Sequence, residues 1–177
     1  EYCDECKKRI SDDRLHIVND NFFTYKIEKY VGETETLFLG NPPWATNSEL
    51  NFNLPEKENF KRLSGTDAIT GASNFDICEY IILKLIEKSV NKNVAIAMLC
   101  KTSVARNVLL ELDRNDVCVD DLRIYNFDSS KVFGISAPAC LLYIKMSTSK
   151  FEDSIPFFIS FIAFASSISM QVDLTIS

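Results

Sequence analysis

The sequence has few glycines, which make a backbone flexible, and few prolines, which make it rigid: there are five of each among 177 residues. That composition excludes low-complexity and collagen-like proteins. Histidine occurs once, as His16 within the apolar run Leu15–Val18, where a strand residue is expected rather than a metal ligand. No secretory signal is visible before that run, which favours a reduced, cytoplasmic protein over a disulfide framework.

The six cysteines do not follow a complete metal-binding pattern. Cys3 and Cys6 form Cys-x-x-Cys, which is typical of half a zinc site or of a redox pair, but no second pair follows. The remaining cysteines stand singly within apolar segments: Cys78, Cys100, Cys118 and Cys140. Free cysteine in such places behaves as a small hydrophobe, so we predict no metal site within this chain.

Strand-like and helix-like segments alternate along the chain. Strands are expected over residues 15–18, 36–39, 94–100, 122–125 and 139–144. Asn74 or Asp76 is placed to cap a helix over residues 77–86, and Ser103 to cap a second one. The run 94–100 is continuously apolar, as in a parallel strand covered on both faces. The alternation predicts an α/β fold with a doubly wound sheet.

Asn41-Pro42-Pro43-Trp44 directly follows the apolar run that ends at Gly40. Two prolines cannot continue a central strand, because neither donates a ladder hydrogen bond. The chain therefore leaves the sheet at Asn41 as a stiff loop, at the strand end where α/β proteins bind ligands. An amide, proline carbonyls and an indole suit the recognition of a planar base by its amino edge and its ring.

This motif resembles the catalytic motif of S-adenosylmethionine-dependent amino-methyltransferases, chiefly DNA adenine-N6 methyltransferases. Further segments are similar, in family order, to enzymes of type II restriction–modification systems: Val18–Phe23, Ser73–Tyr80 and Met98–Arg106. The likeness covers residues 15–146. It implies that the Asn41 side chain and the Pro42 carbonyl accept the two N–H groups of a flipped adenine, while Trp44 stacks on its ring.

The resemblance implies further contacts with base and cofactor. Pro43 and Phe133 are expected to line the base, although Phe133 also fits a buried turn. Asn21 is expected to meet the adenine of S-adenosylmethionine and Phe22 to pack on it; Asp20 competes with Asn21 for that role, and core packing is the alternative for Phe22. Asp76 is expected to cap its helix rather than face the cofactor.

Glycine is absent where the family needs it, since none precedes Gly32. Relatives begin with a glycine-rich loop after their first strand, which admits the methionine portion of the cofactor. The expected fold is therefore a partial doubly wound, Rossmann-like methyltransferase sheet over residues 1–146, with the first strand and glycine loop missing. Activity of this piece alone is accordingly in doubt.

Two segments lack clear periodicity or family likeness. Residues 45–73 read as a long loop, either over the active site or as a surface insertion. The tail 147–177 is apolar from Ser154 to Val172. It is interpreted as a buried segment or a sequence foreign to the family, with a membrane span least favoured.

The sequence therefore predicts a site-specific DNA adenine methyltransferase that acts on double-stranded DNA. A net charge of −6 is unexpected for such an enzyme, because phosphate contacts need a basic surface. A target-recognition domain, and a fused or partner restriction nuclease, are expected outside this chain. The alternatives are an enzyme that methylates a protein glutamine or an RNA base, and an inactive fragment of the fold.

Overall fold

The computed structural model describes residues 17–22, 24–31, 34–45 and 76–148, together with residues 5, 8 and 9. The elements, in chain order, are η1 (Ile27–Tyr30), β1 (Thr36–Gly40), α3 (Ile77–Ser89), β2 (Val94–Lys101), α4 (Thr102–Arg114), β3 (Val119–Phe127), α5 (Ser129–Phe133) and β4 (Ala139–Met146). Most of the predicted loop 45–73 and nearly all of the tail 147–177 lie outside the described residues.

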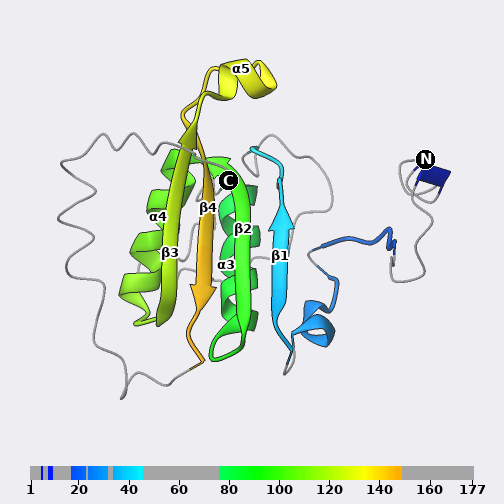
Figure 1. Cartoon of the computed structure of the whole chain (residues 1–177), viewed down its shortest axis with the longest axis vertical. Coiled ribbons are helices and arrows are strands. Elements are labelled where there is room, and N and C mark those ends of the chain that lie inside the picture. The colour runs from blue at the N-terminus through cyan, green and yellow to red at the C-terminus, as the bar shows by residue number, and fades with distance from the viewer. Residues whose placement is uncertain are drawn as a thin grey trace, which may run out of the picture.

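The four described strands form one mixed sheet in the order β1-β2-β4-β3 (Figure 1). β1 pairs with β2 in parallel, whereas β4 is antiparallel to both β2 and β3. β1, β2 and β3 therefore point the same way, and β4 alone is reversed. Its reversal follows from the short connection 128–138, because a parallel return needs a longer crossover.

The predicted α/β class is confirmed in this small mixed sheet, which is consistent with part of a Rossmann-like sheet. Within the described ranges, the two long helices α3 and α4 lie on the same face of the sheet (Figure 1). Both pack against β2, whose residues alternate between the helix layer and the opposite face. The fully buried side chains of this layer include Ile82, Leu112, Ile96 and Leu142.

Local signals predicted several elements well. The run 94–100 is indeed a buried strand, and only Leu99 within it is partly exposed. Asp76 caps α3 as expected, since its side chain accepts the Cys78 N–H. No described helix has the length and apolar character needed to cross a membrane.

Two expectations about local structure are wrong. Ile17 and Val18 are described but form no strand, and Val18 is about half exposed; Leu15 and His16 lie outside the described residues. Ser103 does not cap α4, because β2 passes directly into that helix after Lys101. The N–H of Thr102 donates instead to the carbonyl of Pro138, at 3.0 Å. This hydrogen bond holds the junction between β2 and α4 at Thr102, one residue before Ser103.

Candidate base-binding site at the carboxyl edge of the sheet

The parallel strands β1, β2 and β3 end at one edge of the sheet. Because this edge collects their carboxyl ends, it also collects the segments that follow them: the Asn41–Trp44 loop, the start of α4 and the α5 connection. Figure 1 shows α5 projecting beyond the sheet at this edge. Such an edge is the usual place for ligands in open α/β sheets.

Trp44 is held firmly at this edge. Its indole N–H donates to the carbonyl of Leu99 in β2, at 3.2 Å, and its ring packs against the core while remaining partly exposed. The carbonyl of the next residue, Ala45, accepts the N–H of Ile77, the first residue of α3, at 2.9 Å. The loop is therefore tied both to the sheet and to a helix.

The remaining residues of the motif are less enclosed than Trp44 at their two outer positions. Asn41 and Pro43 are exposed, and Pro42 is half buried. Within the described ranges, no hydrogen bond engages the Asn41 side chain, so its amide is available to a ligand. Gly40, at the end of β1, lies so close to β2 that an added Cβ would meet the Met98 Sδ at 3.0 Å.

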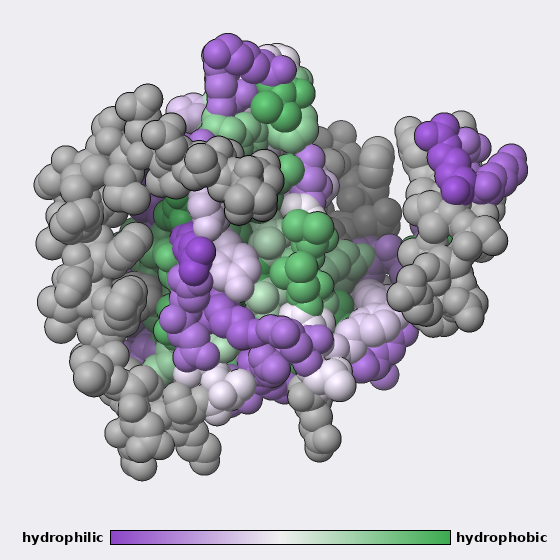
Figure 2. Space-filling view, viewed as in Figure 1, coloured by the Kyte–Doolittle hydropathy of each residue, from purple (hydrophilic) through white to green (hydrophobic). Residues whose placement is uncertain are grey.

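Three aromatic rings meet beside the motif. The centroid of the Phe133 ring lies 5.9 Å from the centroids of both Trp44 and Phe127, with interplanar angles of 82° and 74°. These edge-to-face geometries are favourable for aromatic pairs. Phe133 stays 40% exposed, and Figure 2 shows apolar surface at α5, where Val132 and Ile135 are exposed as well. The structure thus brings together Trp44 and Phe133 from distant parts of the sequence, while the contacts expected of them with a base stay predictions.

The position of Phe133 depends on how α5 begins and ends. The Asp128 side chain accepts hydrogen bonds from the Ser130 hydroxyl and from the N–H groups of Ser130 and Lys131. The Ser130 hydroxyl above all, and then these N–H groups, hold the pKa of Asp128 below its usual value. Gly134 ends the helix with φ of 69°, a left-handed conformation that favours glycine. The Ser129 hydroxyl donates to the carbonyl of Ile135 at 2.8 Å and closes the connection.

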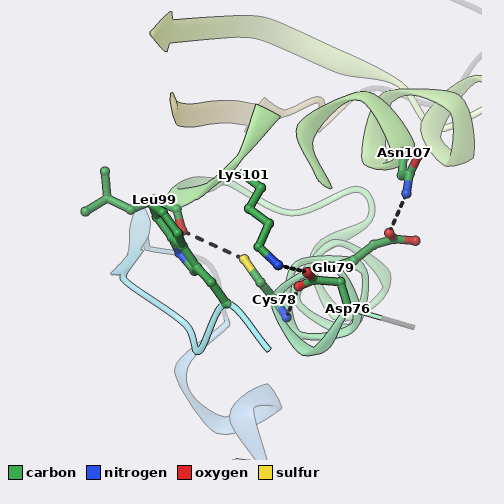
Figure 3. Close-up of polar contacts among 7 residues, drawn as sticks. Asp76, Cys78, Glu79, Leu99, Lys101 and Asn107 are labelled. Carbon is green, nitrogen blue, oxygen red and sulfur yellow. Dashed lines mark hydrogen bonds and ion pairs between the residues drawn. The ribbon is translucent and has the colours of Figure 1, made fainter. Parts of the chain in front are cut away.

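A partly buried ion pair stands behind the motif. Figure 3 shows Lys101 reaching from the end of β2 to Asp76 at the start of α3, with Nζ and Oδ2 3.1 Å apart. Nearby, the Asn107 amide of α4 donates to the buried carboxylate of Glu79 at 2.7 Å, linking the two helices (Figure 3). The sequence analysis assigned no role to Lys101 or Phe127. For Lys101, the feature that could have indicated one is a charged residue at the end of a long apolar strand.

The predicted cofactor residues lie in a turn beside η1. The Asp20 carboxylate accepts the N–H of Asn21 at 2.7 Å, and the carbonyl of Asn21 accepts the N–H of Tyr25 at 2.9 Å. Phe22 is half buried beside α3, with the Lys84 Nζ 5.6 Å from its ring centroid and 3.4 Å from its carbonyl. At 1.5 Å per residue, Lys84 lies about 12 Å along α3 from Asp76. Phe22 therefore packs against a later part of α3 than the start of the helix, which contacts the motif.

Three thiols lie beneath the edge in the core. Cys100 and Cys140 are partners across β2 and β4 with their sulfurs 3.8 Å apart, and Cys78 donates to the Leu99 carbonyl. The contact with Cys100, together with burial, raises the pKa of Cys140. For Cys100 the contact with Cys140 lowers the pKa, but the contact with Cys78 and burial outweigh it and raise the pKa to about 12.

These buried cysteines are the small hydrophobes that the sequence predicted. The described part of the chain holds no group of three metal-ligating side chains arranged to bind an ion. Cys3 and Cys6 lie outside the described residues, so the alternatives for that pair stay open.

Comparison with known proteins adds one informative likeness. No family model matches the chain, and no solved structure matches it. The chain is 36% identical over 153 residues to the type II methyltransferase M.NspV of Nostoc sp.. The match covers 81% of this chain and 32% of the relative, so the chain spans about a third of that protein's length. This chain is therefore a distant homologue of a type II methyltransferase.

Proposed function

We propose that this chain carries the base-binding part of an enzyme that methylates DNA at the N6 amine of adenine. The observation that supports this most strongly is the exposed Asn41 amide beside Trp44 and Phe133, at the carboxyl edge of the sheet. The homology to a type II methyltransferase supports methyl transfer as the reaction, and the choice of the adenine N6 amine rests on the motif.

In this proposal, a flipped adenine lies with its ring against Trp44. Stacking of a base on an aromatic side chain is worth about 1–3 kcal/mol. The hydrogen bond from Trp44 to Leu99 fixes the indole before the base arrives, so little ordering is left to occur on binding. Phe133, which keeps 40% of its surface exposed and touches the Trp44 ring edge-to-face, borders the base at the edge of that stack.

The Asn41 oxygen and the Pro42 carbonyl accept the two N–H groups of the adenine amine. The lone pair of that nitrogen is normally delocalised into the ring, which makes it a poor nucleophile. Two acceptors favour a more tetrahedral nitrogen whose lone pair is directed outward, toward the methyl donor. Orientation of this kind contributes about 7–11 kcal/mol in well-aligned reactions.

The methyl donor, S-adenosylmethionine, supplies an electrophilic methyl group on a sulfonium centre. The residues of this chain fit its adenine end: Asn21 offers an amide, Asp20 an exposed carboxylate and Phe22 a half-buried ring beside α3. Asn21 and Asp20 are alternatives for the contact with the cofactor adenine. No glycine-rich loop for the methionine portion is present among residues 1–31.

Duplex DNA is the proposed partner, although the net charge of −6 is adverse for phosphate contacts. We therefore propose that a target-recognition domain outside residues 1–177 supplies the basic surface. A restriction nuclease, fused or separate, completes the proposed system.

The test is a chimera in which this chain replaces the matching stretch of M.NspV. Duplex DNA, RNA and protein are incubated in parallel with labelled S-adenosylmethionine, and the digested products are resolved by mass spectrometry. We expect N6-methyladenine. Methylated cytosine would overturn the choice of base, and label found only in protein glutamine or in RNA would favour another amino-methyltransferase.

A further inference from the structure

The ion pair between Asp76 and Lys101 connects the start of α3 to the end of β2. Only 13% of the Asp76 side chain and 29% of the Lys101 side chain are exposed. One carboxylate oxygen of Asp76 accepts the Cys78 N–H at 2.9 Å, and the other lies 3.1 Å from the Lys101 Nζ. The cap and the ion pair therefore use different oxygens, so either can be removed without the other.

Two further hydrogen bonds complete a closed ring around the base of the motif. Trp44 donates to Leu99, two residues before Lys101 in β2. Ala45, next to Trp44, accepts from Ile77, next to Asp76. β2 and α3 are therefore joined twice: once by the ion pair, and once by the motif, which hydrogen-bonds to both.

We propose that Asp76 and Lys101 are positioning residues that hold the Asn41–Trp44 loop in its reactive place. The inference rests on the proposed function, because it assigns these residues a task in that reaction. Neither touches the base. Their ion pair sets the distance between α3 and β2, and the loop spans that same distance through its two hydrogen bonds.

Local contacts alone do not account for this arrangement. A helix N-cap needs one carboxylate oxygen, and Asn serves there as well as Asp does. The second oxygen of Asp76 binds the Lys101 ammonium group, and this ion pair holds the long Lys101 side chain in a partly buried position. Removal of either partner leaves the other charge partly desolvated, so the start of α3 shifts relative to β2.

The variants Asp76→Asn and Lys101→Gln remove the ion pair, and Asp76→Asn keeps the helix cap. Lys101→Arg retains the charge and is expected to restore wild-type behaviour. Glu35→Gln is the matched control, since it removes the Glu35–Lys145 pair, whose 2.6 Å contact lies away from the motif. Circular dichroism verifies that helix content is unchanged in each variant.

Fluorescence reports directly on the loop, because Trp44 is the only tryptophan of the chain. We expect Asp76→Asn and Lys101→Gln to shift the emission to longer wavelength and to increase quenching by acrylamide. Lys101→Arg and Glu35→Gln should match the wild type. Unchanged Trp44 emission and quenching in both pair-breaking variants would overturn the inference.

Catalysis supplies a second readout in the M.NspV chimera. We expect kcat to fall on the order of 10- to 100-fold in Asp76→Asn, as for a small misplacement of reacting groups, with KM for S-adenosylmethionine little changed. An unchanged kcat in this variant would also overturn the inference. If the wild-type chimera transfers no methyl group, the proposed function fails, while the fluorescence comparison still decides whether the ion pair positions the loop.

Discussion

Replacing Trp44 with Phe removes the indole N–H while keeping an aromatic ring in the motif. The lost hydrogen bond to the Leu99 carbonyl is partly buried, and such bonds contribute about 0.5–1.5 kcal/mol net. The Leu99 carbonyl is not left without a partner, because the Cys78 thiol still donates to it, 3.8 Å away. The cost therefore stays near the loss of the bond itself.

Lost burial adds to this cost. Phe is smaller than Trp, and about 25 cal/mol is lost per Å² of apolar surface, so a half-buried site gives about 0.5 kcal/mol more. We expect Trp44→Phe to lower the free energy of unfolding by about 1–2 kcal/mol in total. For a chain of this size that corresponds to a fall in Tm of about 2–8 °C.

The assay is urea unfolding followed by circular dichroism, since the variant has no tryptophan to report by fluorescence. The matched control is Tyr30→Phe, which removes the exposed hydrogen bond between the hydroxyls of Tyr25 and Tyr30, 2.6 Å long. We expect this control to change stability by less than about 0.5 kcal/mol. Equal stabilities of Trp44→Phe and the wild type would refute the anchoring of Trp44 to β2.

Three further predictions concern the elements that support the site. Gly134→Ala should cost about 1–2 kcal/mol in urea unfolding, because only the left-handed backbone opposes an added Cβ, which meets nothing within 4 Å; Gly134→Asn should cost less. Folded Cys100 and Cys140 resist ionisation, so the free energy of unfolding should fall as pH rises from about 9, where unfolded thiols ionise, toward about 12. The fall should be shallower when both are replaced by Ala. Leu142→Ala, at a fully buried position of β4, should cost about 2–5 kcal/mol in thermal unfolding, and a cost below about 1 kcal/mol would contradict its burial in the core.

Local sequence patterns predicted what depends on neighbouring residues. The apolar run of β2 and the cap of α3 by Asp76 are examples, because a strand buried on both faces and a helix N-cap can each be recognised from a few consecutive residues. The place of the Asn41–Trp44 motif at a strand end was predicted in the same way, from two prolines after an apolar run.

Long-range contacts were beyond such reasoning. Trp44 donates a hydrogen bond to Leu99, which lies 55 positions later in the chain. Lys101 pairs with Asp76, which lies 25 positions earlier. Ser103 was predicted as a cap from its type, but α4 begins at Thr102, whose N–H donates to the distant Pro138 carbonyl. The meeting of Phe133 with Trp44 was expected only through the family resemblance.

The central claim is that an adenine amine is methylated while it is bound to Asn41. The most direct measurement is the rate of N6-methyladenine formation by the M.NspV chimera carrying Asn41→Ala. Asn41 is exposed, so folding should be preserved, and Asn126→Ala serves as an exposed-amide control. We expect a loss on the order of 100- to 1,000-fold, as for the removal of a group that stabilises a transition state. A rate equal to that of the unaltered chimera would contradict it.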